Sequence, residues 1–447
     1  MANLSPASTL WHPFTQMRGF AAEQAPVIER GDGVWLIDTN GRRYIDGVSS
    51  LWCNVHGHRH SGIDTAIREQ LDRVAHTTML GLSHPPAEEL ADRLVELAPR
   101  PSPQEESRHP ISRVFFSDSG STAVEVALKM AYQYWQQSSD ARPSRTAFLS
   151  LEDGYHGDTI GSVSVGGIDL FHSLYRPLLF DSHKVPAGDV DALAEALAAH
   201  DDEIAAVVIE PLVQGAAGIK LQPDGYLEAV RGLCDRHDVF LICDEVATGF
   251  GRTGRMFACE YERVVPDFLC LGKGLTGGYL PLAATLTTER VFEGFLGSHE
   301  EFRTFFHGHT FTGNPLGCAA ALATLDAFEQ ERTLERLTPK IALLRQLLAG
   351  LVERLPHVQE VRQLGFMCGI ELAADPAHQV GYDAGLRMGY EVTLEARSRG
   401  AIIRPLGDVV ILMPPLSIEA DELEELVEIT ADSIAAATGA AELRAAA

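Results

Sequence analysis

The chain has 447 residues, 45% of them hydrophobic and 22% charged, and its formal net charge at pH 7 is −26. Negative charge of this size argues against non-specific binding to nucleic acids and to anionic membranes, because both are themselves negatively charged. The chain contains no apolar run as long as a transmembrane helix and no basic-then-apolar signal pattern at its N-terminus, so we expect a cytoplasmic protein.

Chain length and cysteine usage indicate the number of domains and the state of the thiols. A chain of this length is expected to form one large domain and a smaller one. Its seven cysteines include no Cys-x-x-Cys pair, and several lie in or beside apolar runs. Buried free thiols are therefore expected, rather than disulfides or a zinc site.

The predicted elements, in chain order, indicate an α/β fold. Short strands are expected at residues 33–38 and 41–46, and apolar strands then alternate with helical patterns at 113–117, 146–150, 205–209, 239–243, 268–271 and 282–286. This alternation is typical of a mostly parallel sheet covered by helices. A long helical stretch at about 316–354 leads to strands at 361–372 and 401–413 and to an amphipathic helix at 419–437.

Two polar residues follow neighbouring apolar strands. Residues 239–243 end at Asp244, and residues 268–271 end at a Gly-Lys pair, with Lys273 29 positions after Asp244. The carboxyl ends of strands in an open α/β sheet form the crevice where such folds bind ligands. A carboxylate and an amine there are what pyridoxal 5′-phosphate (PLP) chemistry needs, although a lysine at a strand end can also simply extend to solvent.

The other lysines do not compete with Lys273 for this role. Lys and Arg total 36, but only five of these residues are lysines, and Lys273 alone among them ends an apolar strand. Arginine is not an alternative amine nucleophile, because its guanidinium stays protonated.

A Ser-Asp-Ser-Gly-Ser-Thr segment at 117–122 follows a strand and opens a helix. Apolar residues then recur at helical spacing, and Thr122 with Glu125 forms a capping-box pattern. Gly120 and Ser121 would present free backbone N–H groups and a hydroxyl, which suit a phosphate, although the segment also fits a plain helix cap.

The Gly-Tyr-His-Gly-Asp loop at 154–158 could place Tyr155 against a flat ring, or be an ordinary turn with a core tyrosine.

Three further motifs are ambiguous. Residues 249–254 spell Gly-x-Gly-x-x-Gly, but no apolar-periodic helix follows, so a Gly-rich surface loop is favoured over a dinucleotide site. His-x-His-x-His at 56–60 and His-x-His at 307–309 have chelating spacing, but no carboxylate pair completes a ligand set, and we assign no metal ligands. Arg404 follows an apolar run and could clamp a substrate carboxylate or form an internal ion pair.

Taken together in this order, these motifs resemble those of the class III aminotransferases of PLP fold type I, over essentially the whole chain. Within this family the chain looks like the biotin-pathway branch that makes 7,8-diaminononanoate. The segments that carry the resemblance lie at 11–15, 46–50, 118–121, 154–158, 244–254, 272–278 and 307–314.

The resemblance implies a role for each motif residue. Lys273 would hold the cofactor as a Schiff base and shuttle the proton, and Asp244 would pair with the pyridinium nitrogen. Tyr155 would stack on one ring face and Val246 on the other. The implied catalytic residues are Lys273, Asp244 and Tyr155. The implied PLP-binding residues are Gly120, Ser121, Tyr155, His156, Asp244, Val246 and Lys273, with His309 and Thr310 supplied by the partner subunit. The implied substrate residues are Phe14, Leu51, Trp52, Tyr155, Lys273, Gly308 and Arg404.

The implied reaction is transamination of 8-amino-7-oxononanoate to 7,8-diaminononanoate by a homodimer with shared active sites. An ω-amino-acid:pyruvate aminotransferase is the alternative. Members that use S-adenosylmethionine typically have tyrosine where this chain has Phe14, and two tryptophans where it has Leu51 and Trp52. These departures look more like the branch that uses L-lysine as amino donor. The implied architecture is a large PLP-binding domain at 61–330 and a small α+β domain at 331–447, with residues 1–60 contributing to the small domain and the active site.

Overall fold

The computed structural model describes residues 9–20, 23, 25–101 and 109–446. Its largest sheet has the strand order β4-β12-β11-β10-β7-β5-β6. Neighbouring strands run parallel except at β12, which is antiparallel to both of its neighbours. The strands are β4 (Ile111–Ser117), β5 (Ala147–Leu151), β6 (His183–Val185), β7 (Ile204–Ile209), β10 (Phe240–Asp244), β11 (Phe268–Leu271) and β12 (Ala283–Thr288). The predicted mostly parallel α/β sheet is thus confirmed.

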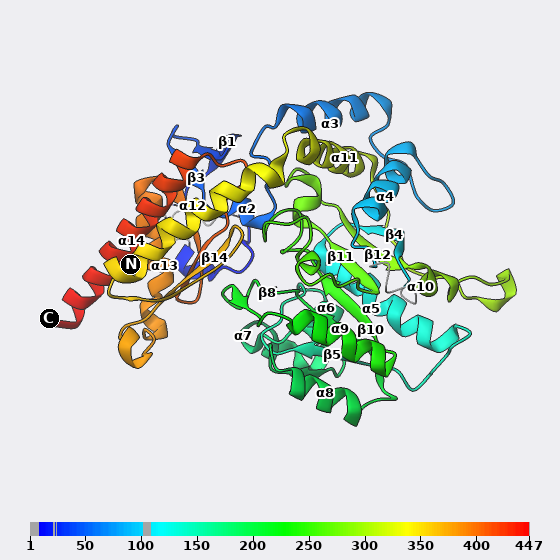
Figure 1. Cartoon of the computed structure of the whole chain (residues 1–447). Helices are drawn as coiled ribbons and strands as arrows, with labels where there is room; N and C mark the ends of the chain where they lie inside the picture. Colours follow the sequence, from blue (N-terminus) through cyan, green and yellow to red (C-terminus); the bar gives the residue numbers. More distant parts are fainter. Residues whose placement is uncertain (1–8, 21–22, 24, 102–108, 447) are drawn as a thin grey trace.

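Helices cover both faces of this sheet (Figure 1). Alternate residues of β10 show this, because side chains of a strand point to opposite faces. Phe240 and Ile242 pack in one apolar cluster with α5, whereas Leu241 and Cys243 pack in another with α8 and α9. The helices of this part are α3 (Ser61–Arg73), α4 (Pro85–Leu97), α5 (Gly120–Gln137), α6 (Ile160–Val165), α7 (Asp169–His172), α8 (Val190–Ala199), α9 (Tyr226–His237), α10 (Glu289–Glu293) and α11 (Pro315–Gln330).

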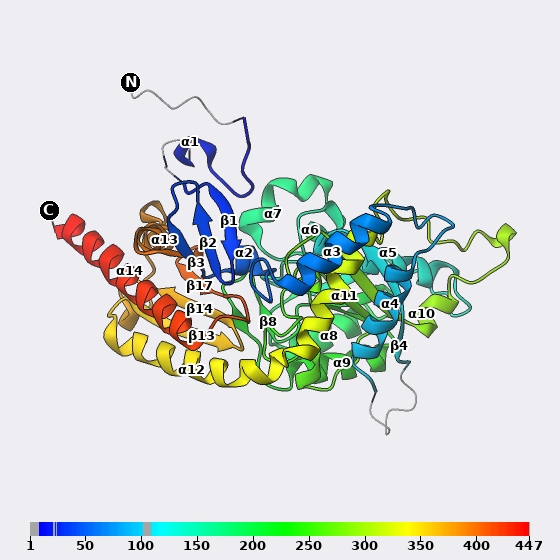
Figure 2. The ribbon, with the colours of Figure 1, turned by 90° about the horizontal axis from the view of Figure 1, so that it is seen from above.

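Two four-stranded sheets and three helices form the rest of the fold, and the two ends of the chain meet there. One sheet has the order β1-β2-β3-β15 and the other β13-β14-β17-β16. Strand β3 pairs in parallel with β15, which follows it by more than 350 residues, and Figure 2 shows β1 to β3 beside α13 and α14. The elements are β1 (Ile28–Asp32), β2 (Trp35–Asp38), β3 (Arg43–Asp46), β13 (Val358–Leu364), β14 (Met367–Leu372), β15 (Ala401–Ile402), β16 (Arg404–Leu406), β17 (Val409–Leu412), α12 (Thr333–Arg354), α13 (Met388–Arg399) and α14 (Ala420–Ala446). Domain boundaries at residues 60 and 330 stay a prediction.

The remaining elements are short. They are α1 (Met17–Phe20), α2 (Ser49–Trp52), β8 (Val213–Gln214), β9 (Lys220–Leu221) and the 3₁₀ helices η1 (Ser173–Leu178), η2 (Ala258–Tyr261), η3 (Lys273–Thr276), η4 (His299–Glu301), η5 (Pro376–His378) and η6 (Ala384–Leu386). None of the helices in the described ranges is long and apolar enough to cross a bilayer.

Several predicted element boundaries were wrong. The helical stretch at 316–354 is two helices, α11 and α12, separated where Arg332 takes a left-handed backbone with φ of 52°. The strand expected at 361–372 is the hairpin β13–β14, which turns at Gly365 with φ of 61°. The strand expected at 401–413 is three strands that belong to two sheets. The N-cap of α5 is Ser119, which forms a capping box with Thr122. This is one turn earlier than the predicted capping box of Thr122 with Glu125.

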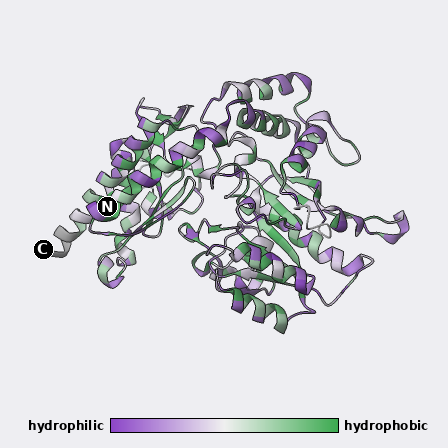
Figure 3. Cartoon of the chain, viewed as in Figure 1, coloured by the Kyte–Doolittle hydropathy of each residue, from purple (hydrophilic) through white to green (hydrophobic). Residues whose placement is uncertain are grey.

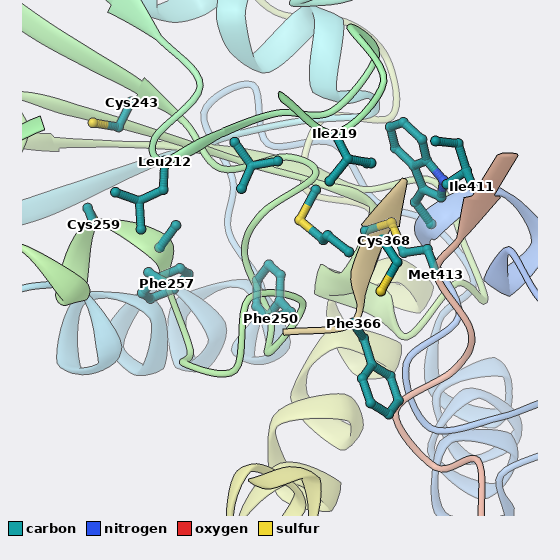
Figure 4. Close-up of a cluster of buried hydrophobic side chains, with 14 of the residues drawn as sticks. Leu212, Ile219, Cys243, Phe250, Phe257, Cys259, Phe366, Cys368, Ile411 and Met413 are labelled. Carbon is teal, nitrogen blue, oxygen red and sulfur yellow. The ribbon is translucent and has the colours of Figure 1, made fainter. Parts of the chain in front are cut away.

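The glycine-rich loop at 249–254 is buried, so the surface-loop interpretation was wrong. Phe250 lies in an apolar cluster with Phe257, Phe366 and Met413, shown in Figure 4. The guanidinium of the buried Arg252 donates hydrogen bonds of 2.8 Å to the carbonyl oxygens at positions 54 and 414. The loop therefore connects the large sheet to an N-terminal segment at residue 54 and to a C-terminal segment at residue 414.

Colouring by hydropathy shows how the apolar residues are distributed (Figure 3). The central strands of the large sheet are mainly hydrophobic, whereas α3 on the outside carries long hydrophilic stretches. All seven cysteines are free, and only Cys53 is not buried, which confirms the expectation of free thiols.

Candidate active site

Strand register brings Asp244 and Lys273 to one edge of the sheet. Strands β10 and β11 are parallel neighbours, and Asp244, the last residue of β10, lies opposite Cys270. Two residues later the chain leaves β11 at Gly272, and Lys273 opens the short helix η3. Both side chains line one cavity of about 390 Å³, a volume within the range of small-ligand sites.

A buried histidine holds Asp244 in place. The Nδ1 atom of His156 lies 2.8 Å from Oδ2 of Asp244, and both side chains are buried. Burial alone would lower the pKa of His156, but the hydrogen bond and the negative charge of Asp244 outweigh it, so the pKa of His156 is raised. Because a carboxylate can only accept, Nδ1 carries the proton. The hydrogen bond fixes the orientation of the Asp244 carboxyl group in the cavity.

The ammonium group of Lys273 is destabilised by its surroundings. Burial lowers the pKa of Lys273, although the charges of Asp244 and Glu210 oppose this shift. Its Nζ atom lies 4.7 Å from the centre of the Trp52 ring. Trp52 lines the same cavity, and its indole Nε1 is buried without a hydrogen-bond partner in the described part of the chain.

The first turn of α5 forms a cradle in which a side chain larger than glycine does not fit. A Cβ atom added to Gly120 would lie 2.4 Å from Cγ1 of Val246. The Ser121 hydroxyl lies 2.8 Å from Oγ1 of Thr159 and accepts the Thr159 backbone N–H at 3.0 Å. Free N–H groups at the start of an 18-residue helix, beside hydroxyls and within reach of a lysine and a carboxylate, fit the phosphate and ring of PLP.

Tyr155 and Glu210 form another wall of this cavity. The Tyr155 hydroxyl donates to Oδ2 of Asp158 at 2.9 Å, and burial with this contact raises the pKa of Tyr155. The Glu210 carboxyl accepts backbone N–H groups from Tyr155 and Gly215 at 3.0 Å each. Burial raises the pKa of Glu210 to about 7.

Glu210 is a site residue that the sequence analysis missed. It directly follows the buried strand β7, as Asp244 ends β10. The rule that selected Asp244, a polar residue closing an apolar run, also applies to residues 205–209 and would have found it.

Three predicted substrate residues line a second cavity of about 410 Å³, namely Phe14, Leu51 and Arg404. The side chains of Leu51 and Trp52 point in different directions because residues 49–52 all have positive φ, between 45° and 72°. This left-handed turn directs Trp52 to the cavity with Lys273 and Leu51 to the other. A left-handed run of L-residues is strained, and such strain is characteristic of functional sites.

The two cavities are also linked by aromatic contacts. The Phe14 ring packs edge-on against Phe171 with centroids 5.6 Å apart, and Phe171 packs against Tyr155 at 6.3 Å. Arg404 is exposed by surface area, but neighbouring atoms partly desolvate its guanidinium and lower its pKa, and within the described residues it has no ion pair. The internal ion pair that the sequence left open is therefore not formed with any described residue.

Gly308, His309 and Thr310 are not among the described residues that line either cavity of this chain. His309 lies near Asp118 instead, with Nε2 3.9 Å from its Oδ1. The histidines of the His-x-His-x-His motif have separate partners: His56 contacts the Thr324 carbonyl, His58 pairs with Asp46, and His60 pairs with Glu331. They do not converge on a common point.

The family model "Aminotransferase class-III" matches residues 20–434. The chain belongs to the class-III aminotransferases. It is therefore a PLP-dependent aminotransferase of the α/β architecture described above.

Individual relatives agree with this assignment. A protein of Nitratidesulfovibrio vulgaris named "Adenosylmethionine-8-amino-7-oxononanoate aminotransferase" is 56% identical, over 97% of this chain and 81% of its own. The crystal structure of the enzyme of that name from Methanocaldococcus jannaschii has a TM-score of 0.90 at 44% identity and covers 95% of this chain and 96% of its own. An amine transaminase from an uncultivated Pseudomonas species, in its PLP-bound form, has a TM-score of 0.88 at 37% identity, covering 96% and 98%.

Proposed function

We propose that this aminotransferase converts 8-amino-7-oxononanoate to 7,8-diaminononanoate in biotin synthesis, with S-adenosylmethionine as amino donor. The observation that carries the proposal is the similarity, at 56% identity over nearly the whole chain, to a protein named for that reaction. The names of several further relatives, at 44–50% identity, also specify adenosylmethionine. They favour this donor over L-lysine, to which Phe14 and Leu51 pointed.

Bound PLP would supply a ring that accepts the electrons released when a substrate carbon loses its proton. We assign to Lys273 the attachment of the cofactor and the movement of that proton, since burial lowers its pKa and increases the fraction of neutral amine. Asp244 would keep the proton on the ring nitrogen. His156 supports this role by donating its Nδ1–H to Asp244 and fixing the orientation of that carboxyl group.

Other residues would position the cofactor. The backbone N–H groups of Gly120 and Ser121 would hold the phosphate at the start of α5, where the helix dipole favours negative charge. Tyr155 and Val246 line the same cavity and would bracket the ring. We propose that His309 and Thr310 complete the phosphate site of a second copy of this chain, since they lie outside the cavity of their own.

Arg404 would recognise the carboxylate at the far end of the keto acid. Its guanidinium, which forms no ion pair with the residues that the structure describes, lies in the second cavity, beyond the turn that separates Leu51 from Trp52. A guanidinium without an internal partner can bind a carboxylate through two parallel hydrogen bonds. Phe14, Leu51 and the Gly308 segment of a partner subunit would line the path between the two ends of the substrate.

We also propose a cytoplasmic homodimer with shared active sites. Large apolar side chains are exposed on the segment beside His309, including Phe302, Phe306 and Phe311, each more than half exposed. A second subunit would cover them, as expected for an obligate interface. The free thiols throughout the chain fit a reducing compartment.

The alternative is an ω-amino-acid:pyruvate aminotransferase, because solved structures named as an amine transaminase and an omega transaminase match at 37% and 30% identity. The deciding experiment follows the visible absorbance of the PLP-loaded enzyme. Addition of 7,8-diaminononanoate or S-adenosylmethionine should convert the cofactor to its pyridoxamine form, and 8-amino-7-oxononanoate should then restore it. Restoration by pyruvate alone would favour the alternative, and conversion by L-lysine but not S-adenosylmethionine would replace the proposed donor.

A further inference from the structure

Two histidines and a glutamate meet at the edge of the large sheet. His183 is the first residue of the edge strand β6, His200 caps the end of α8, and Glu203 lies in the turn before β7. Each offers one ligand atom, and these atoms all lie within 4.8 Å of one another. The two imidazole rings are stacked with centroids 3.9 Å apart, and His200 Nδ1 lies 3.2 Å from Oε2 of Glu203.

The backbone holds these three positions in place. His183 is paired with Leu149 of β5. The N–H of Glu203 donates to the His200 carbonyl at 2.9 Å, and the Glu203 carbonyl accepts the N–H of Ala147, at the start of β5, at 3.0 Å. The backbone at all three positions is thus fastened to the sheet, whereas the Glu203 side chain is 59% exposed.

The local charge favours a cation. His200 lies at the C-terminal end of α8, where the helix dipole is negative. The acidic side chain of Glu203 adds a negative charge beside the two imidazoles.

We propose that His183, His200 and Glu203 bind one transition-metal cation of the Zn²⁺ type, with water in the remaining coordination position. Two imidazoles and one carboxylate are a ligand set that Zn²⁺ accepts and that Mg²⁺ and Ca²⁺ do not prefer. The sequence analysis did not predict this site, because the ligands come from three separate elements.

The site is distinct from the cavity that contains Lys273. Across the sheet, His183 of β6 lies opposite Leu149 of β5, which lies opposite Val207 of β7, which in turn lies opposite Leu241 of β10. Leu241 is three residues before Asp244. Three strand spacings, about 14 Å, separate β6 from β10. The ion would therefore serve structure, fastening a three-residue edge strand to the end of α8.

This edge strand supports a loop of the active site. The N–H of Glu152 donates to the Val185 carbonyl of β6 at 2.8 Å, just before the loop that carries Tyr155. Short edge strands are among the first parts of a sheet to open. Metal bound at His183 would therefore stabilise the folded chain without entering the reaction.

The test is calorimetric titration of ZnCl₂ into the PLP-loaded enzyme after removal of metals with a chelator. Wild type should bind one Zn²⁺ per chain with micromolar affinity, and His200→Gln and Glu203→Gln should each weaken binding about tenfold or more. The matched control is His378→Gln, because His378 also pairs with a carboxylate three residues away, with Nδ1 2.7 Å from Oδ2 of Asp375, but belongs to no group of three possible metal ligands among the described residues. This control should bind Zn²⁺ as wild type does.

Thermal unfolding gives a second measurement on the same proteins. Zn²⁺ should raise the melting temperature of wild type and of His378→Gln, but not of His200→Gln. All metal-free variants should retain wild-type transamination, which shows that they fold. Absence of Zn²⁺ binding by wild type, or equal affinity in wild type and both ligand variants, would overturn the proposal.

Discussion

Substitution of Gly120 by alanine should weaken PLP binding. The added Cβ would lie 2.4 Å and 2.9 Å from the two γ-methyl carbons of Val246. Ordinary carbon contacts are about 3.5–4.0 Å, so Val246 or the first turn of α5 must shift by about 1 Å or more. Both line the cofactor cavity.

Overpacking of this kind costs about 1–3 kcal/mol. Because the displaced groups are those proposed to contact the phosphate and the ring, we expect the loss to appear in PLP affinity. At about 1.4 kcal/mol per factor of ten, the dissociation constant should rise about 5-fold to about 140-fold. The measurement is reconstitution of the apoenzyme with PLP, followed by absorbance.

Two further variants make the reasoning refutable. Gly232→Ala is the matched control, since the nearest atom to its Cβ is Arg236 Nη1 at 3.7 Å; it should leave PLP affinity unchanged. The double variant Gly120→Ala, Val246→Ala removes the two clashing methyl groups and should recover part of the lost affinity. Wild-type affinity in Gly120→Ala, or no recovery in the double variant, would refute the assignment of Gly120 to the phosphate cradle.

Three other predictions follow from the site. Lys273→Ala should abolish turnover, and product formed beyond one equivalent per active site would remove Lys273 from its proposed role. Arg404→Ala should raise KM for 8-amino-7-oxononanoate about 10-fold to about 140-fold with kcat little changed, since a charged hydrogen bond contributes about 1.5–3 kcal/mol. An unchanged KM would place the carboxylate elsewhere. Burial raises the pKa of Glu210 from 4.5 to about 7, so the folded apoprotein binds this proton more tightly than the unfolded chain does. Its contribution to stability is present below about pH 4.5 and falls by about 3 kcal/mol as the pH rises to about 7. Urea unfolding of apo Glu210→Gln should lose less stability over this range than wild type, and equal losses would contradict the buried carboxyl.

The large sheet was predictable because strands buried on both faces are recognisable as short apolar runs between turn residues. Strand β11 has the predicted bounds, and β10 differs by one residue at each end. Asp244 and Lys273 were found for the same reason: a charged residue that closes such a run is unusual, and parallel strands align their carboxyl ends.

Turns that depend on one residue with a left-handed backbone were not predicted. Gly365 lies within a largely apolar stretch, and its left-handed turn divides that stretch into two strands. Arg332 ends one helix before another in the same way. Neither residue interrupts the local pattern of polarity, which is the signal used to predict elements. The left-handed turn at 49–52, which directs Leu51 and Trp52 into different cavities, is of the same kind.

The sequence by itself determined the order of the elements, the class of sheet and the residue types at the strand ends, because these depend on near neighbours in the chain. Only the tertiary structure decided which distant residues meet. Val246 closes over Gly120, and Arg252 joins the two ends of the chain. His183, His200 and Glu203 likewise converge only once α8 packs beside β6. Such contacts depend on the direction of each side chain and on the packing of the whole chain, which local periodicity does not encode.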